Sequence, residues 1–501
     1  MKTIKLLSFT ILVLMIFSSF HFFGKNTIHT TNAMPNSYMK FSTNILLSTN
    51  NTVYDQHVEP TLALGTGGII YVGWKDALTF DGGGYRVSYT YFNGAFWQKP
   101  IRMPQAFTDA RQSDVWMASV DSHLYFAYLE FNNAQTISNV TLADTVDNGA
   151  NWNIRSISNA SSFADKETMV VRPNGDIFMG YNDIGLGFRL SSSFDGGKTF
   201  SDVFAIQDSL DGGTGLYLLL GKNNNLFAFW SNYENNAPPT SMGDIIYDNS
   251  SDSGATWGTD RALNPGLNGS VFTSNPLTGG PMVVSLPTAV YDPVRDRIYV
   301  SWSDISADPT HYNFNSYMRY SDDNGVTWSN RYLIADDNGY NQWHPDMALD
   351  SLGNVHLVYY DNTTNGYKLE HRTFYPDNNT FSQVQDISSA YTPGQFTRPG
   401  EYFGLKIDSN DRIHVAWADG RNGKEDIYYA YMDLRKSTYV PNPTPTTSST
   451  PTTSSTSTPT TTPSPSTSST HSKSSRLDIS PIFVNSLIIF IFFNRKRKNY
   501  L

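Results

Sequence analysis

A short pattern that recurs seven times along the chain constrains its fold more than any other feature. Each copy has an aliphatic residue, an aromatic residue or His, two mostly apolar residues, Trp or Tyr, any residue, and then Asp, Asn or Glu. The copies are IYVGWKD from Ile70, LYFAYLE from Leu124, IFMGYND from Ile177, LFAFWSN from Leu226, IYVSWSD from Ile298, VHLVYYD from Val355 and IHVAWAD from Ile413. They start 54, 53, 49, 72, 57 and 58 residues apart, which is the spacing of β-propeller blades.

The segments around each copy read as antiparallel strands, because short β-branched and aromatic runs alternate with Gly- and Asn-containing turns. After the last copy only one strand, DIYYAYMDL from Asp426, precedes a Ser-, Thr- and Pro-rich stretch. The segment KFSTNILLS from Lys40 is expected to supply the missing outer strand and so to remove an open sheet edge. The sequence therefore predicts an all-β, seven-bladed β-propeller over residues 39–435, closed by an N-terminal strand that completes the last blade.

A second motif, Ser/Thr-x-Asp-x-Gly-x-Thr/Asn-Trp/Phe, closes the third strand of four units. It occurs as TVDNGANW from Thr145, SFDGGKTF from Ser193, SSDSGATW from Ser250 and SDDNGVTW from Ser321. In these boxes the chain resembles the sialidase-like (BNR, or Asp-box repeat) β-propellers. Sialidases have six blades, so six is the alternative count, and the 72-residue gap could hide a miscount.

The box aspartates are expected to have a structural role. They can accept backbone N–H groups across a tight turn, while the Gly supplies a positive φ and the aromatic residue packs between neighbouring sheets. These aspartates are Asp147, Asp195, Asp252 and Asp323.

The resemblance covers about residues 40–435 and is specific for the fold rather than for the chemistry. Sialidases use a Tyr nucleophile, and in that family a Glu serves as its base, an Asp as the acid/base, and three Arg bind the substrate carboxylate. The resemblance implies Tyr402 as nucleophile, Asp81 as acid/base, and Glu401 or Glu59 as base.

The arginines depart from the family pattern. Arg398 and Arg421 lie on plausible loops, but residues 57–60, where the family's Arg-Ile-Pro signature should fall, contain no Arg. A clamp of three arginines therefore cannot be assembled from this sequence. Without it, a bound carboxylate would lose charge-assisted hydrogen bonds of about 1.5–3 kcal/mol each.

Two sets of polar residues are expected on one face of the ring, at the starts of the first strands and at the ends of the second strands. They form a predicted acidic rim, in which the candidate ligand-binding residues are Asp76, Asp114, His344, Asp361 and Asp419. Such carboxylates beside Trp and Tyr suit sugar hydroxyls, and closely spaced acids could hold Ca²⁺; no other cofactor is predicted. The alternative is that an acid after a strand caps the following turn.

Composition excludes several classes of function. The chain carries 45 acidic and 35 basic side chains, a formal charge of −10, which argues against nucleic acid as a partner. It contains no cysteine, so a disulfide framework, a zinc knuckle, an iron–sulfur cluster and a thiol nucleophile are all excluded.

The two ends predict an extracellular, membrane-anchored protein. Residues 1–33 have the basic and then apolar order of a signal peptide or N-terminal anchor. Residues 441–475 read as a Ser/Thr/Pro-rich stalk, residues 479–494 as a C-terminal transmembrane segment or processed anchor, and residues 495–501 as a basic cytoplasmic tail. Seven Asn-x-Ser/Thr sequons are compatible with a glycoprotein.

These features favour a cell-surface propeller that binds exposed glycans or acts in adhesion. A glycoside hydrolase, either a divergent exo-sialidase or an enzyme acting on another exposed sugar, is the alternative. A structural envelope protein is the third.

Overall fold

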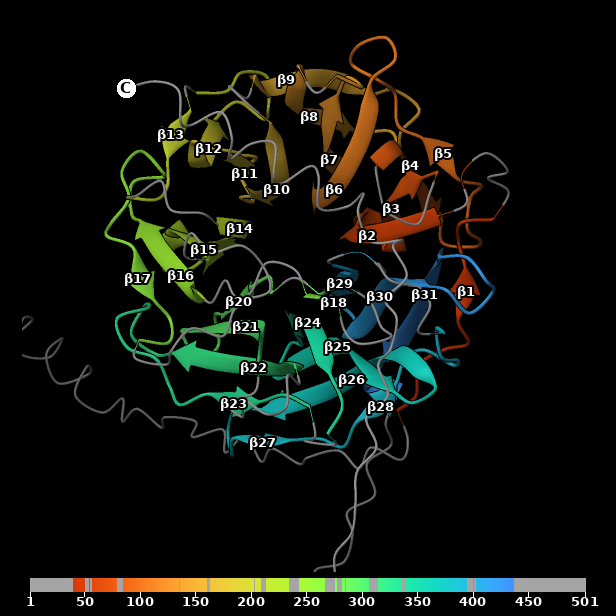
Figure 1. Cartoon of the computed structure of the whole chain (residues 1–501), viewed down its shortest axis with the longest axis vertical. Coiled ribbons are helices and arrows are strands. Elements are labelled where there is room, and N and C mark those ends of the chain that lie inside the picture. The colour runs from red at the N-terminus through yellow and green to blue at the C-terminus, as the bar shows by residue number, and fades with distance from the viewer. Residues whose placement is uncertain are drawn as a thin grey trace, which may run out of the picture.

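The computed structural model describes residues 39–49, 54, 56–78, 84–134, 136–159, 163–201, 203–208, 213–233, 243–265, 275–276, 282–283, 285–305, 314–335, 339–393, 400 and 402–436. These residues form seven antiparallel sheets arranged in a ring (Figure 1). Each sheet is one blade, and its first strand in sequence lies innermost, except that the last blade takes its outer strand from the N-terminal end.

The strands follow one another blade by blade. Blade 1 holds β2 (Gln56–Leu64), β3 (Ile70–Ala77), β4 (Gly84–Phe92) and β5 (Ile101–Arg102); blade 2 holds β6 (Arg111–Val120), β7 (His123–Phe131), β8 (Ser138–Thr145) and β9 (Asn153–Asn159). Blade 3 holds β10 (Ala164–Val171), β11 (Ile177–Asp183), β12 (Gly187–Ser193) and β13 (Phe204–Ala205); blade 4 holds β14 (Gly213–Leu220), β15 (Leu226–Tyr233), β16 (Gly243–Ser250) and β17 (Arg261–Ala262).

The second half of the ring repeats the order. Blade 5 holds β20 (Thr288–Asp292), β21 (Arg297–Ile305), β22 (Phe314–Ser321) and β23 (Tyr332–Leu333); blade 6 holds β24 (Gln342–Leu349), β25 (Val355–Thr363), β26 (Gly366–Tyr375), β27 (Thr380–Phe381) and β28 (Gln385–Asp386). Blade 7 holds β29 (Gly404–Ile407), β30 (Arg412–Asp419), β31 (Asp426–Asp433) and β1 (Ile45–Leu46). Three short 3₁₀ segments, η1 (Thr66–Gly68), η2 (Lys222–Asn224) and η3 (Leu434–Lys436), lie between or after strands.

The prediction of seven blades is confirmed, and the six-bladed alternative is wrong. The long interval between the fourth and fifth repeats contains a separate two-stranded ribbon of β18 (Asn275–Pro276) and β19 (Met282–Val283). This ribbon is inserted between blades 4 and 5 and belongs to neither of their sheets.

The predicted closure of the ring is also confirmed. Strand β1 pairs antiparallel with β31, and Ile45 lies opposite Tyr429. The hydroxyl of Ser48 donates a hydrogen bond of 2.9 Å to Oδ1 of Asp426. The N-terminal segment therefore covers an edge of blade 7 that would otherwise have unpaired backbone groups.

The recurring Trp-x-Asp sequence has a packing reason. Residues two apart on a strand point to the same side, and in three blades the indole N–H donates to the carboxylate two residues later. The pairs are Trp74 with Asp76 (2.8 Å), Trp302 with Asp304 (3.3 Å) and Trp417 with Asp419 (3.1 Å). The acid thus accepts the indole N–H, so the large Trp ring is buried in the core without leaving an unpaired donor.

The four Asp-boxes share one geometry. In the box of blade 4, Oδ1 of Asp252 accepts the Ser250 hydroxyl at 2.8 Å and the Thr256 backbone N–H at 2.9 Å, while Oδ2 accepts the Thr256 hydroxyl at 2.6 Å. Asp147, Asp195 and Asp323 make the corresponding contacts in their own turns. Each carboxylate therefore stabilises one turn by accepting hydrogen bonds from residues on both sides of it.

Among the described residues, no helix combines the length and apolar character needed to cross a membrane. The predicted signal or anchor at residues 1–33, the stalk at 441–475, the anchor at 479–494 and the tail at 495–501 lie outside the described residues.

Candidate functional site

A backbone irregularity repeats on the inner strands. The strands β2, β6, β10, β14 and β24 each shift register at the same place in the blade. At each shift one residue has a positive φ: Glu59 (55°), Asp114 (42°), Lys166 (53°), Gly215 (69°) and His344 (50°). A non-Gly residue in this conformation costs about 1–2 kcal/mol, and such strain concentrates at functional sites. The bulges lie at the same level of the ring, and this level is therefore the candidate position of a functional site.

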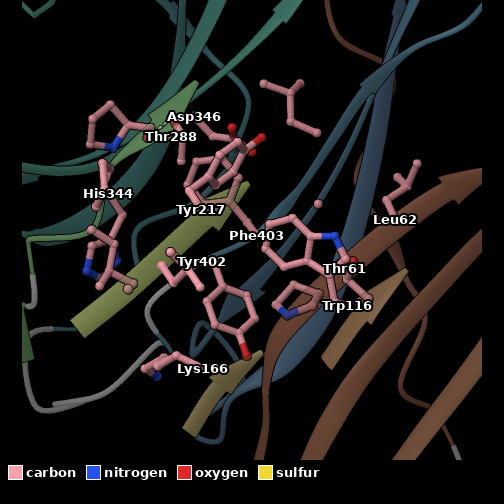
Figure 2. A pocket seen from close by; sticks show the side chains of 18 of the residues that line it. Thr61, Leu62, Trp116, Lys166, Tyr217, Thr288, His344, Asp346, Tyr402 and Phe403 are labelled. Carbon is pink, nitrogen blue, oxygen red and sulfur yellow. Dashed lines mark hydrogen bonds between the residues drawn. The ribbon is translucent and has the colours of Figure 1, made fainter. Parts of the chain in front are cut away.

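At this level the inner strands surround a cavity of about 80 Å³, which we call the axial cavity. All seven blades contribute to its lining, and Figure 2 shows the labelled side chains from several inner strands around the common space. Its aromatic members are Trp116, Tyr217, Tyr402 and Phe403. The volume accommodates several water molecules or a compact polar group.

Tyr402 and Glu59 meet beside the axial cavity. The Tyr402 hydroxyl donates to Oε2 of Glu59 at 3.3 Å and accepts the backbone N–H of Val115 at 3.2 Å. Gly400 makes this approach possible, because a Cβ there would lie 2.7 Å from the backbone nitrogen of Glu59. The phenol oxygen therefore has an acceptor for its proton and a donor that would stabilise negative charge on it.

Lys75 supplies the countercharge for this pair. Its Nζ lies 2.6 Å from Oε1 of Glu59 and 3.8 Å from Oδ1 of Asp114, and all three side chains are buried. A buried carboxylate is stable only when it is paired, so Lys75 favours the ionised form of Glu59. Glu59 is thus set up to accept a proton.

Lys166 connects this cluster to blade 3. Its Nζ lies 5.7 Å from the centroid of the Tyr402 ring, and its backbone N–H donates to Oδ2 of Asp114 at 3.3 Å. A cation at a ring face is attracted by the π-electrons. Lys166 therefore adds positive potential on the side of the tyrosine that faces blade 3.

Glu167, which our sequence reasoning missed, also lines the axial cavity. Only 4% of it is exposed, and neither carboxyl oxygen has a hydrogen-bond partner on another described residue. Burial, and then the charges of Asp114 and Asp165, hold the pKa of Glu167 well above its ordinary value. The available signal was a third consecutive charged residue in the strand segment ADKETMVV, directly after Asp165 and the aligned Lys166.

Asp346 is a second cavity carboxyl that sequence reasoning passed over. Burial raises its pKa to about 6, while the charge of Lys406 and the backbone N–H of Met347, which donates to Oδ1 at 2.7 Å, favour the carboxylate. Asp346 in turn contributes to a raised pKa of Tyr217, which is caused mainly by burial.

Two of the predicted ligand-binding residues lie at this site. His344 lines the axial cavity, and Asp114 contacts Lys75 as described above. The Ser113 hydroxyl also donates to Oδ1 of Asp114 at 3.0 Å.

The other three, Asp76, Asp361 and Asp419, are 3% exposed or less and do not line the cavity. Asp76 accepts the Ser88 hydroxyl at 2.6 Å and lies 2.7 Å from Nδ1 of His57. Asp361 accepts Nε2 of Gln342 at 2.8 Å. Asp76 and Asp361 are therefore engaged inside their own blades.

Asp419 is engaged in the same way. It accepts the Ser388 hydroxyl at 2.8 Å and pairs with Arg421, whose Nη2 lies 2.5 Å from Oδ2. Arg421 is thereby committed to a structural ion pair inside blade 7, away from the axial cavity. The predicted site residues Asp81, Arg398 and Glu401 lie outside the described residues.

Within the described part of the chain, no group of three or more His, Asp or Glu side chains is arranged to hold a metal ion. None of the described residues lining the axial cavity is an arginine.

No protein-family model and no curated protein sequence matches the chain. Solved structures with a similar fold include a Penicillium chrysogenum α-L-arabinanase complexed with arabinobiose (13% identity, TM-score 0.47) and a Fusarium graminearum α-L-arabinofuranosidase with an iminosugar inhibitor (9%, 0.48). Each of these matches covers 79% of this chain and 99% of the other. A leech intramolecular trans-sialidase matches at 11% identity and a TM-score of 0.43 over 64% of this chain and 67% of its own. At such identities the similarities assign no activity to this chain.

Proposed function

We propose that the protein is a glycoside hydrolase that releases a terminal sugar at the axial cavity. The observation that carries this proposal is the hydrogen bond from Tyr402 to Glu59, with the carboxylate buried and paired with Lys75. A phenol is a weak nucleophile until a base takes its proton. The contact provides that base within hydrogen-bond reach.

The proposed reaction retains the configuration of the sugar. In the first half, the oxygen of Tyr402 bonds to the anomeric carbon while its proton passes to Glu59, and the glycosidic bond breaks. In the second half, water attacks the same carbon and the tyrosine leaves, recovering its proton from Glu59. The backbone N–H of Val115, 3.2 Å from the phenol oxygen, would stabilise the negative charge that develops there.

The lining favours a neutral sugar over a sialic acid or a uronic acid. Aromatic faces such as Trp116 and Tyr217 suit the C–H surfaces of a sugar ring, and Glu167 and Asp346 can hydrogen-bond to hydroxyl groups. A substrate carboxylate would meet these two acids as well as Lys166 and Lys406, and no arginine among the described lining residues offers it a bidentate pair.

A glycan-binding protein without turnover is the second candidate. The predicted stalk at residues 441–475 and anchor at 479–494 favour it, because together they would display the ring away from a cell surface. In that case the aromatic lining would hold a sugar, and the Tyr402 contact with Glu59 would serve only to shape the cavity.

A panel of neutral and acidic aryl glycosides, tested with the wild type and with Tyr402→Phe, separates the two candidates. Tyr431→Phe is the matched control, because Tyr431 is 37% exposed and does not line the cavity. Turnover of a neutral glycoside that falls at least about 100-fold in Tyr402→Phe alone supports the hydrolase. Retention on a glycan array without turnover supports the binder, and neither activity would reject both.

A further inference from the structure

We infer that Glu167 is the general acid of the site, donating its proton to the oxygen of the departing group. This inference rests on the proposed hydrolase function and adds a catalytic residue to it. It also differs from the assignment of Asp81 that the sialidase resemblance implies.

The position of Glu167 is the first argument. The residue lies on β10 at the bulge that begins with Lys166 and lines the same cavity as Tyr402. It is nine-tenths buried or more, and neither carboxyl oxygen meets a hydrogen-bond partner on another described residue. A buried polar group without a partner costs about 1–3 kcal/mol. A substrate oxygen entering the cavity would satisfy this carboxyl.

The contrast between Glu167 and Glu59 is the second argument. Glu59 faces the ammonium of Lys75 at 2.6 Å, which favours its charged form. Glu167 instead lies near Asp114 and Asp165, and burial together with these negative charges raises its pKa well above the ordinary value, against the opposing effects of its own backbone N–H and of Lys166. Two carboxyls in one site with opposite environments take opposite roles, one as base and one as acid.

The proton balance closes with these two groups. In the first half-reaction the glycosidic bond breaks, its electron pair stays on the leaving oxygen, and that oxygen takes the proton of Glu167. Glu59 has meanwhile received the proton of Tyr402. In the second half-reaction the attacking water gives one proton to Glu167, and Tyr402 regains its own from Glu59, so both acids return to their starting forms.

Asp346 is the nearest competitor within the described lining. Its pKa of about 6 is also raised, but Oδ1 already accepts the Met347 N–H and the charge of Lys406 favours the carboxylate. It is therefore the matched control: a cavity carboxyl that should contribute to binding without protonating the leaving group.

The test uses aryl glycosides of one neutral sugar whose phenols differ in acidity, with the wild type, Glu167→Gln, Asp346→Asn and Asp81→Asn. Removing a general acid costs about 10²–10⁴-fold with a poor leaving group and much less with dinitrophenol, which leaves without a proton. We expect this steep dependence for Glu167→Gln alone. We also expect exogenous azide to rescue Glu167→Ala by forming a glycosyl azide.

Two results would overturn the inference while leaving the hydrolase intact. One is an equal loss in Glu167→Gln for every leaving group, and the other is the steep dependence appearing in Asp81→Asn or Asp346→Asn instead. Absence of wild-type turnover on every glycoside would reject the hydrolase and the inference together.

A measurement on the protein without substrate checks the proton directly. Infrared difference spectra at pH 7 between the wild type and Glu167→Gln should show the C=O band of a protonated carboxyl. A carboxylate band in its place would reject Glu167 as the acid even if turnover is found. Urea unfolding of each variant separates a folding defect from a chemical one.

Discussion

The hydroxyl of Tyr402 lies 3.3 Å from Oε2 of Glu59, although 343 positions separate the two residues in the chain. The contact exists because blade 7, completed by β1, closes the ring against blade 1. Site and closure are therefore coupled: a change that opens the ring between these blades also separates the proposed nucleophile from its base.

Loss of the Lys75 ammonium should destabilise the fold strongly. In Lys75→Met the buried Glu59 keeps its charge without a partner, which typically costs about 3–5 kcal/mol. The double variant Glu59→Gln/Lys75→Met should recover much of this loss, because it leaves no buried charge in the pair. Urea unfolding of the wild type, both single variants and the double variant measures the coupling, and purely additive effects would contradict the pairing.

Asp346→Asn should stabilise the protein at alkaline pH but not at acid pH. Burial raises the folded-state pKa of Asp346 to about 6 from an ordinary 3.8, so ionisation opposes folding as the pH rises through this window. Above it, the neutral variant should be more stable by up to roughly 3 kcal/mol. Urea midpoints at pH 4 and pH 8 test this, with the exposed Asp121→Asn as control. An equal difference at the two pH values would refute the assignment.

The Asp-boxes should make stability fall between about pH 4 and pH 2. Hydrogen bonds from the Thr256 hydroxyl and N–H, and then from Ser250, lower the pKa of Asp252 to about 2, and corresponding bonds lower that of Asp147 to about 2. A lowered carboxyl pKa stabilises the fold above the ordinary value, and this contribution is lost as the pH falls through the folded-state value.

Asp252→Asn tests this pH dependence. The variant should have a lower melting temperature than the wild type at pH 7, and its melting temperature should fall less on acidification. Parallel melting curves of wild type and variant from pH 7 to pH 2 would show that the box carboxylate does not contribute. Asp121→Asn serves again as the control for removing an exposed charge.

A charge at the closing strand should open blade 7. Ile45 pairs with Tyr429 and packs against the apolar cluster between blades 7 and 1, so Ile45→Asp should cost about 1–3 kcal/mol. The released edge of β31 should also promote self-association. Melting temperature and size-exclusion chromatography measure both effects, with the exposed Thr43→Asp as control. Identical behaviour of the two variants would mean that β1 does not hold the ring closed.

The architecture could be predicted from sequence because each blade repeats a local pattern. The copies starting at Ile70 and Ile413 differ in detail, but both place an aliphatic residue, an aromatic or His, and a Trp at fixed spacing. The missing outer strand of the last unit pointed to the segment from Lys40. Both deductions need only strand periodicity and the requirement that a sheet edge be covered.

The chemistry was predicted less completely, because it depends on backbone conformation and on partners far apart in sequence. The run of charged residues around Lys166 marks this segment, but the bulge there breaks the strict alternation of the strand, so the sequence does not show that Glu167 is the one that lines the cavity. Asp76 was predicted to lie on an open rim. Its carboxylate instead accepts the indole N–H of Trp74, and this partner can be recognised only once the strand is known to be buried on that side.

The positive φ at the repeated bulge also limits which substitutions can be accepted around this cavity. A β-branched residue at Glu59, Asp114, Lys166, Gly215 or His344 would collide with its own backbone at a positive φ. Accepted substitutions there should favour Gly, Asn, Asp and other unbranched side chains, and at Gly215 a side chain must also displace Leu286, because a Cβ would lie 2.2 Å from its Cδ2. Saturation libraries confined to Lys166 and His344, which line the cavity and lie outside the ion pair of Glu59, would therefore sample new sugar preferences on an unchanged ring.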